Sequence, residues 1–142
     1  MKWQITLTSE EFATVFQVTV QLYELEESSL LERGCSPEDL GILLSEIRSA
    51  RAVLRGARLA GSSGAVIRTA KDGEPEPRTA VSVYAAEGNQ AAVSFEIPER
   101  IAREWPSLLL FAQSAFGEKE LYYRTGYRAD EVQKAVDALR LH

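Results

Sequence analysis

The sequence predicts an α+β domain with two long N-terminal helices, a small antiparallel sheet of about three or four strands and a C-terminal helical unit. Helix caps and helical periodicity occur toward both ends of the chain, whereas the middle alternates apolar and polar residues with the period of a strand. The 142 residues, 45% of them hydrophobic, are enough for one domain with a core of its own. We therefore expect a single domain made of a strand plus helical hairpin (1–60), a β-meander (64–97) and a helical unit (98–142).

The first element is a short strand, because apolar residues at positions 3, 5 and 7 alternate with polar ones. Thr8 and Glu11 have the spacing of a capping box, which starts a helix that we expect over residues 9–32, ended by Gly34. Residues 12–25 would also fit a strand, since β-branched and aromatic residues alternate with polar ones there. The cap and the acidic run that follows favour the helix.

A second helix follows a clear start signal, in which Ser36 can act as the N-cap and Pro37 takes the first helical position. We expect this helix to continue to about residue 60, where the segment Gly61–Gly64 ends it. Alternating apolar residues then predict an antiparallel meander, joined by the first strand. Its strands are expected within residues 65–70, 81–85 and 93–97, with turns at 71–77 and 87–90.

The composition makes several functions improbable on chemical grounds. Cys35 is the only cysteine and His142 the only histidine, so we expect no His-dependent catalysis and no Cys/His zinc site. No phosphate-binding glycine motif follows a strand. We therefore expect a non-enzymatic protein without a cofactor or a metal.

The sequence also predicts a cytoplasmic protein that does not enter a membrane. No apolar run approaches the roughly 20 residues of a membrane span, and the first residues lack the apolar stretch of a signal peptide. A single cysteine agrees with a reducing compartment.

The segment 121–139, LYYRTGYRADEVQKAVDAL, resembles the turn and third helix of a helix-turn-helix unit. Leu121 would lie in the second helix, and Gly126 would supply the left-handed backbone of the turn Thr125-Gly126-Tyr127. The resemblance covers residues 108–141, with Leu108 to Phe116 as the first helix. It implies that three residues bury the third helix: Val132, Val136 and Leu139.

This unit departs from the helix-turn-helix pattern at Tyr122, where that family usually has a small residue, and we expect the tyrosine to crowd the contact between the helices. Asp130 and Glu131 would begin the third helix, where a DNA reader meets base edges, and they would repel phosphate. The same Gly-Tyr-x-x-x-Glu spacing resembles ubiquitin-associated-type three-helix domains, which bind proteins. A helical hairpin that only closes the core stays open as the third interpretation.

A row of arginines follows one side of the second helix at spacings of three, four and three residues. The row consists of Arg48, Arg51, Arg55 and Arg58. It belongs to a basic middle of the chain, because residues 46–78 carry seven basic and four acidic groups, whereas residues 1–45 carry two basic and eight acidic ones. The row could pair with the acidic first helix, or it could bind an anionic partner, either a protein or a phosphate backbone.

Tyrosines and arginines also gather around the expected C-terminal turn, which is the composition of many protein interfaces. The residues concerned are Tyr123, Arg124, Tyr127 and Arg128. We therefore expect a small non-catalytic regulatory or adaptor protein that contacts another protein or a second subunit, as a homodimer. The alternative is a nucleic-acid-binding transcriptional regulator, but the net charge of −5 opposes approach to a polyanion.

Overall fold

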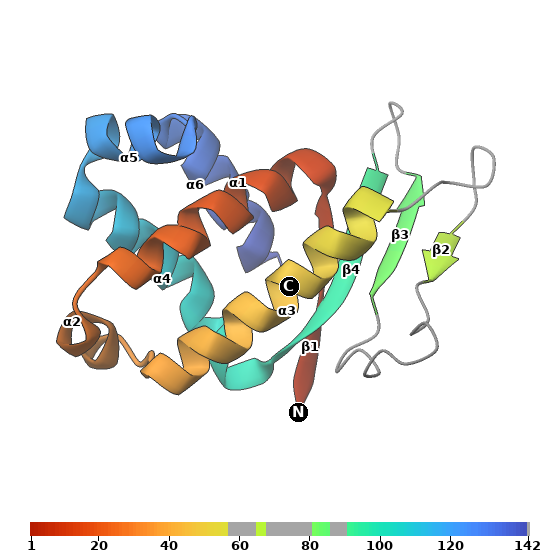
Figure 1. The fold of residues 1–142 in the computed structure, drawn as a ribbon, viewed down its shortest axis with the longest axis horizontal. Coiled ribbons are helices and arrows are strands. Elements are labelled where there is room, and N and C mark those ends of the chain that lie inside the picture. Colours follow the sequence, from red (N-terminus) through yellow and green to blue (C-terminus); the bar gives the residue numbers. More distant parts are fainter. Residues whose placement is uncertain (57–64, 68–80, 86–90, 142) are drawn as a thin grey trace.

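The computed structural model describes residues 1–56, 65–67, 81–85 and 91–141. Within them the chain forms an antiparallel sheet and a larger body of helices, which confirms the α+β class (Figure 1). The sheet lies at one end of the molecule in Figure 1, and the short helix α2 (Glu27–Glu32) lies at the other end.

The described residues form a sheet of four strands in the order β1-β4-β3-β2, with every neighbouring pair antiparallel. The strands are β1 (Lys2–Thr8), β2 (Ala65–Ile67), β3 (Ser82–Ala85) and β4 (Ala91–Pro98). The meander and the added first strand are thus as predicted. Ile5 lies opposite Phe95 and Leu7 opposite Val93, which places the apolar side chains of both strands on one face. The turns expected at 71–77 and 87–90 lie outside the described residues.

The first long helix is shorter than predicted. Helix α1 (Ser9–Val20) begins with the expected capping box, in which the Thr8 N–H donates to Glu11 Oε1 at 2.9 Å and the Glu11 N–H donates to Thr8 Oγ1 at 3.2 Å. Instead of continuing to residue 32, it passes into a 3-10 turn, η1 (Gln21–Glu24), and α2 follows. Leu25 between them is extended, with ψ 155°, and this break accompanies the burial of both Leu22 and Leu30.

The second long helix is α3 (Pro37–Gly56), and its start is as predicted, because the Asp39 N–H donates to Ser36 Oγ at 3.1 Å. Its described part ends at Gly56, and residues 57–64, which include the expected end of the helix, lie outside the described residues.

Three helices make up the C-terminal unit: α4 (Glu99–Phe116), α5 (Glu118–Thr125) and α6 (Ala129–Arg140). The first begins at Glu99, directly after β4, as expected for a helical unit that starts at residue 98, and it contains the segment Leu108 to Phe116 that the resemblance assigns to the first helix. Gly126 has φ 81° and ψ 4° and ends α5, which is the left-handed turn that the sequence predicts. The three residues expected to bury α6 are all in the core.

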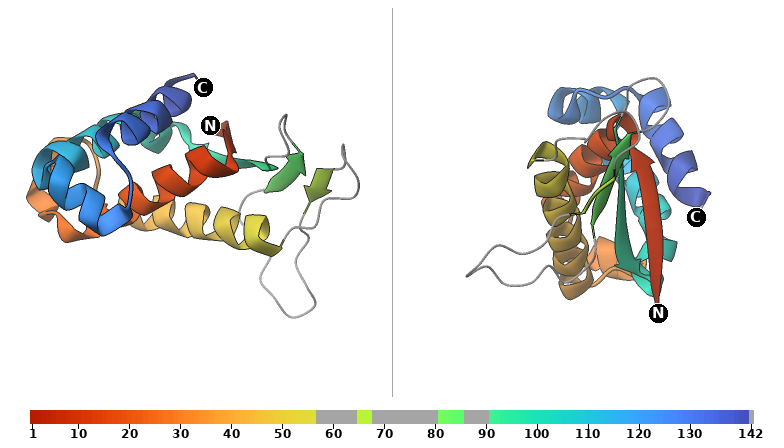
Figure 2. Two further views of the ribbon diagram at one scale, coloured as in Figure 1. Left: turned by 90° about the horizontal axis from the view of Figure 1, so that it is seen from above. Right: turned by 90° about the vertical axis from the view of Figure 1, so that its right-hand side faces the viewer.

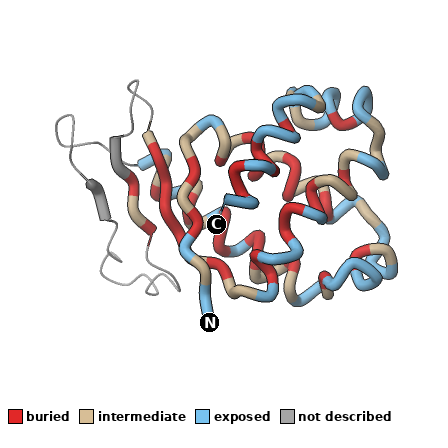
Figure 3. The backbone as a smooth tube through the Cα atoms, turned by 180° about the vertical axis from the view of Figure 1, so that it is seen from behind, coloured by how far each residue is buried: buried red, intermediate tan, exposed pale blue. Residues whose placement is uncertain are grey.

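The core is centred on aromatic side chains from the sheet and the helices. Phe95 of β4 lies edge-on to Phe12 of α1 and to Trp105 of α4, with ring centroids 5.7 and 6.2 Å apart. Trp105 is fully buried, and its indole N–H donates to Thr19 Oγ1 at 3.0 Å, which satisfies the one polar atom that burial would otherwise penalise. Figure 3 shows buried residues on β4 and on the inward turns of the helices.

Helices α3 and α6 lie on opposite sides of the molecule, with α1 between them (Figure 2). Each of the two therefore has one face against the core and one face toward the outside. This arrangement separates the two surfaces that carry the predicted site residues.

Candidate functional site

The arginine row on α3 does not form one uniform surface. Arg48 and Arg55 are exposed, whereas Arg51 is half-buried, with its guanidinium carbon 4.5 Å from the centroid of the Phe16 ring. Arg58 lies outside the described residues. The expected pairing with acids of the first helix is not found in the described part of the chain, where Arg51 meets α1 through an aromatic ring instead.

The outward face of α3 runs the length of the helix and is lined by small residues and a few charges. Ser45 and Ala52 are exposed on it, and a side chain added at Gly41 or Gly56 would meet nothing within 4 Å. The opposite face is fully buried and is formed by Leu40, Leu43, Leu44, Ile47 and Ala50. The face of α3 that carries these small residues is therefore turned away from the core.

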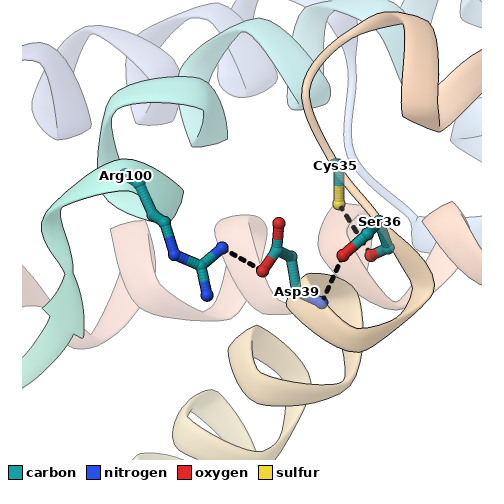
Figure 4. Close-up of polar contacts among 4 residues, drawn as sticks. All are labelled: Cys35, Ser36, Asp39 and Arg100. Atoms are coloured by element: carbon teal, nitrogen blue, oxygen red, sulfur yellow. Dashed lines mark hydrogen bonds and ion pairs between the residues drawn. The ribbon is translucent and has the colours of Figure 1, made fainter.

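The first turn of α3 is fixed to α4 by an ion pair between Asp39 and Arg100 (Figure 4). Burial opposes ionisation of the Asp39 carboxyl, but the hydrogen bond and charge of Arg100, with two contacts to Ser36, outweigh it and hold the pKa of Asp39 below its ordinary value. Burial, with a smaller contribution from the Asp39 charge, raises the pKa of the Cys35 thiol. Cys35 is thus a protonated core residue at neutral pH rather than a nucleophile.

The C-terminal surface has two adjacent exposed tyrosines on α5. Tyr122 is 43% exposed and Tyr123 is 69% exposed, with their ring centroids 6.2 Å apart. Tyr122 is exposed rather than buried between the helices, so the crowding expected from it does not occur. Arg124 lies beside them, with its guanidinium 4.7 Å from the Phe116 ring centroid and its Nε bonded to Glu120 Oε1 at 3.0 Å.

The other two predicted residues of this surface lie at the start of α6. Tyr127 is half-buried and lines a cleft, while Arg128 is exposed and its backbone N–H donates to Glu131 Oε1 at 3.1 Å. Glu131 therefore caps α6, so it has a structural role that its expected place on the surface did not indicate.

The cleft lies between the first turns of α1 and of α6 and has a volume of about 640 Å³. Its charged lining consists of Glu10, Glu11, Glu131 and Lys134. Glu11 and Glu131 already accept backbone N–H groups at their helix starts. The lining is thus acidic, but two of its three carboxylates serve the fold.

Sequence reasoning missed the exposed apolar residues near α2. Tyr23 is 55% exposed and Leu31 is 53% exposed, and Arg33 lies with its guanidinium 3.9 Å from the Phe111 ring centroid. The sequence did not indicate their exposure, because one continuous helix was expected over residues 9–32 and both apolar residues fitted its pattern. In the structure α1 ends at Val20, and both side chains are exposed.

The described part of the chain contains no group of three or more His, Cys, Asp or Glu side chains placed to hold a metal ion. Of the helices in these residues, none has the length and apolar character to cross a membrane.

Comparisons of this chain with protein-family models, with curated proteins and with solved structures find no match. Two surfaces of the described residues remain as candidate contact sites, the outward face of α3 and the tyrosine–arginine surface of α5.

Proposed function

We propose that this chain is a small non-catalytic regulatory or adaptor protein that acts through contact with another protein. The observation that carries the proposal is the pair Tyr122 and Tyr123, two large aromatic side chains that are exposed to solvent on one short helix. Of the large hydrophobic residues exposed in the described chain, only these two are adjacent in sequence and in ring contact.

Physical chemistry favours a protein partner for such a surface. Tyrosine offers a large apolar area and a polar tip and loses little conformational entropy when it is covered, and arginine is enriched in interfaces for its planar donors. Arg124 is already oriented by Phe116 and Glu120, so less side-chain entropy is lost when a partner binds. The surface is therefore partly ordered before contact.

A quantitative capture experiment tests the proposal. The full chain, the variant Tyr122→Ala with Tyr123→Ala, and the control Gln133→Ala with Lys134→Ala are immobilised and exposed to extract of the source cells. We expect at least one protein to bind the wild type and the control, to be lost with the tyrosine variant, and to bind again when purified. Equal profiles for all three, or captured proteins that do not bind directly, would contradict the proposal.

A nucleic-acid-binding regulator is the second candidate, because α5, the left-handed Gly126 and α6 have the helix-turn-helix order of elements. The exposed side of α6 argues against it, since Asp130, Glu131 and Asp137 offset Arg128, Lys134 and Arg140. Fluorescence anisotropy with generic duplex DNA at low and moderate salt separates the two. Tight binding lost in Gln133→Ala with Lys134→Ala would favour the nucleic-acid function.

A further inference from the structure

The outward face of α3 is a helix face with no partner among the described elements. Both views in Figure 2 place α3 at the margin of the molecule, and Figure 1 shows it in front of the sheet. The face is five turns long, since a helix of 20 residues extends about 30 Å. It is thus long enough to seat another helix along its whole length.

The exposed charges on this face are separated by sign. Glu38 lies in the first turn, whereas Arg48 and Arg55 lie in the second half, and all three are exposed. The other charges of α3 are already engaged or buried: Asp39 pairs with Arg100, Glu46 is buried and Arg51 lies over Phe16. What the face offers a partner is therefore an acidic beginning and a basic end.

We infer that a second copy of this chain binds here, with the two α3 helices antiparallel about a two-fold axis. In that orientation the acidic beginning of each helix meets the basic end of the other. The two helix dipoles also oppose one another, which is favourable. The inference rests on the proposed function, because it names the second subunit as one protein that this chain contacts.

The spacing along α3 defines a register for this pairing. Glu38 and Arg55 are equally far from the midpoint between Ser45 and Arg48, and so are Gly41 and Ala52. An axis at that midpoint places Glu38 of one copy beside Arg55 of the other, and Gly41 beside Ala52. Packed helices lie 8–10 Å apart depending on the side chains between them, and small residues at the crossing bring them to the near end of that range.

A second copy fits the face better than an unrelated protein does, because its surface must be complementary to itself. An isologous contact uses the same patch twice, so each sign of charge on the patch needs the opposite sign at the symmetric position. Glu38 and Arg55, at the two ends of the patch, meet this condition, whereas Arg48, near the axis, faces the neutral Ser45. An anionic partner would use Arg48 and Arg55 but would be repelled by Glu38.

Charge reversal tests the pairing by sedimentation equilibrium of the full chain at low and moderate salt. We expect the wild type to dimerise, and Arg55→Glu or Glu38→Arg to weaken the dimer about tenfold or more, because each change turns two attractions into repulsions. The double variant, Glu38→Arg with Arg55→Glu, should restore the dimer. Arg140→Glu, an equal change of charge on α6, should leave it unchanged.

Cross-linking tests the register. Cys35 is buried and should react slowly with a bismaleimide, so introduced cysteines report on the contact. We expect a mixture of Gly41→Cys and Ala52→Cys proteins to cross-link faster than Ala52→Cys alone.

Three outcomes overturn the inference: a monomer at all concentrations, a dimer insensitive to both reversals, or no rescue by the double variant. If sedimentation showed only a monomer, the chain could still bind another protein through Tyr122 and Tyr123 in the capture experiment. The two experiments therefore distinguish failure of the dimer from failure of the proposed function.

Discussion

Helices α3 and α6 both present one face to the core and one to the outside, yet their exposed charges are arranged in different ways. On α6 both signs are mixed along the exposed side, since Lys134 and Asp137 lie between the acids of its first turn and Arg140 at its end, and Gln133 bonds to Asp137 at 2.9 Å within the helix itself. On α3, the exposed acid is at the beginning and the exposed arginines are near the end.

This difference in charge arrangement distinguishes α6, which completes the fold, from α3, which can also bind a partner. Where charges of both signs are mixed, solvent and neighbouring side chains on the same helix compensate them, so the electrostatic potential over the surface has no single sign. Charges that are separated by sign give one face a region of negative potential and a region of positive potential. Helix α6 carries the sequence resemblance to a DNA-reading unit, but the arrangement of charge favours α3 as the surface for association.

The largest effect is expected from the buried side of α6. Leu139→Ala should lower the free energy of unfolding by about 2–4 kcal/mol, because the leucine is buried in the core, on the helix that packs against α1 and α4, and its truncation leaves a cavity. Urea unfolding followed by circular dichroism measures it, and Leu141→Ala, at a position 88% exposed, is the matched control. A loss of less than about 0.5 kcal/mol for Leu139→Ala would show that α6 is not a structural element.

A smaller effect is expected at the start of α6, where Glu131 caps the helix. Glu131→Ala should cost about 0.5–1 kcal/mol, because it removes the acceptor of the Arg128 N–H. Glu131→Gln keeps an oxygen acceptor at the same place and should cost less. Equal losses for the two variants in thermal melts would indicate that charge, rather than the hydrogen bond, is what Glu131 contributes.

The arginines of α3 should differ from one another, although the sequence presents them as one row. Arg51→Ala should cost about 0.5–1 kcal/mol, because it removes the contact with the Phe16 ring. Arg55→Ala, at an exposed position, should stay within about 0.5 kcal/mol. Chemical denaturation at low protein concentration gives both values, and the reverse order would contradict the structural assignment of Arg51.

The smallest effect is expected at Asp39, because its partner Arg100 is exposed and solvent screens the pair. The pKa of Asp39 is lowered in the folded protein, so its stabilising contribution is present above the ordinary pKa of about 3.9 and is lost as the pH falls through the folded value. The difference in stability between wild type and Asp39→Asn should therefore shrink below about pH 4. Asp130→Asn is the control, and a difference independent of pH would exclude this role for the ion pair.

The sequence by itself determined the features that depend on neighbouring residues along the chain. The capping box at Thr8, the cap at Ser36 and the left-handed turn at Gly126 are all where their local patterns predict them. Strand alternation likewise gave the meander, because a strand with one buried face must place its apolar residues two apart. These signals act over a few residues, so one sequence is enough to read them.

Only the tertiary structure decided the features that depend on contacts between distant segments. The break after Val20, the orientation of Tyr122 and the place of Arg51 over Phe16 each follow from what another element covers. The spacing of residues along a helix shows which side chains share a face, but it does not show whether that face packs against the core, is exposed to solvent or contacts another element. That choice depends on how the elements pack together, and it placed Arg51 against an aromatic ring while it left Arg48 and Arg55 exposed.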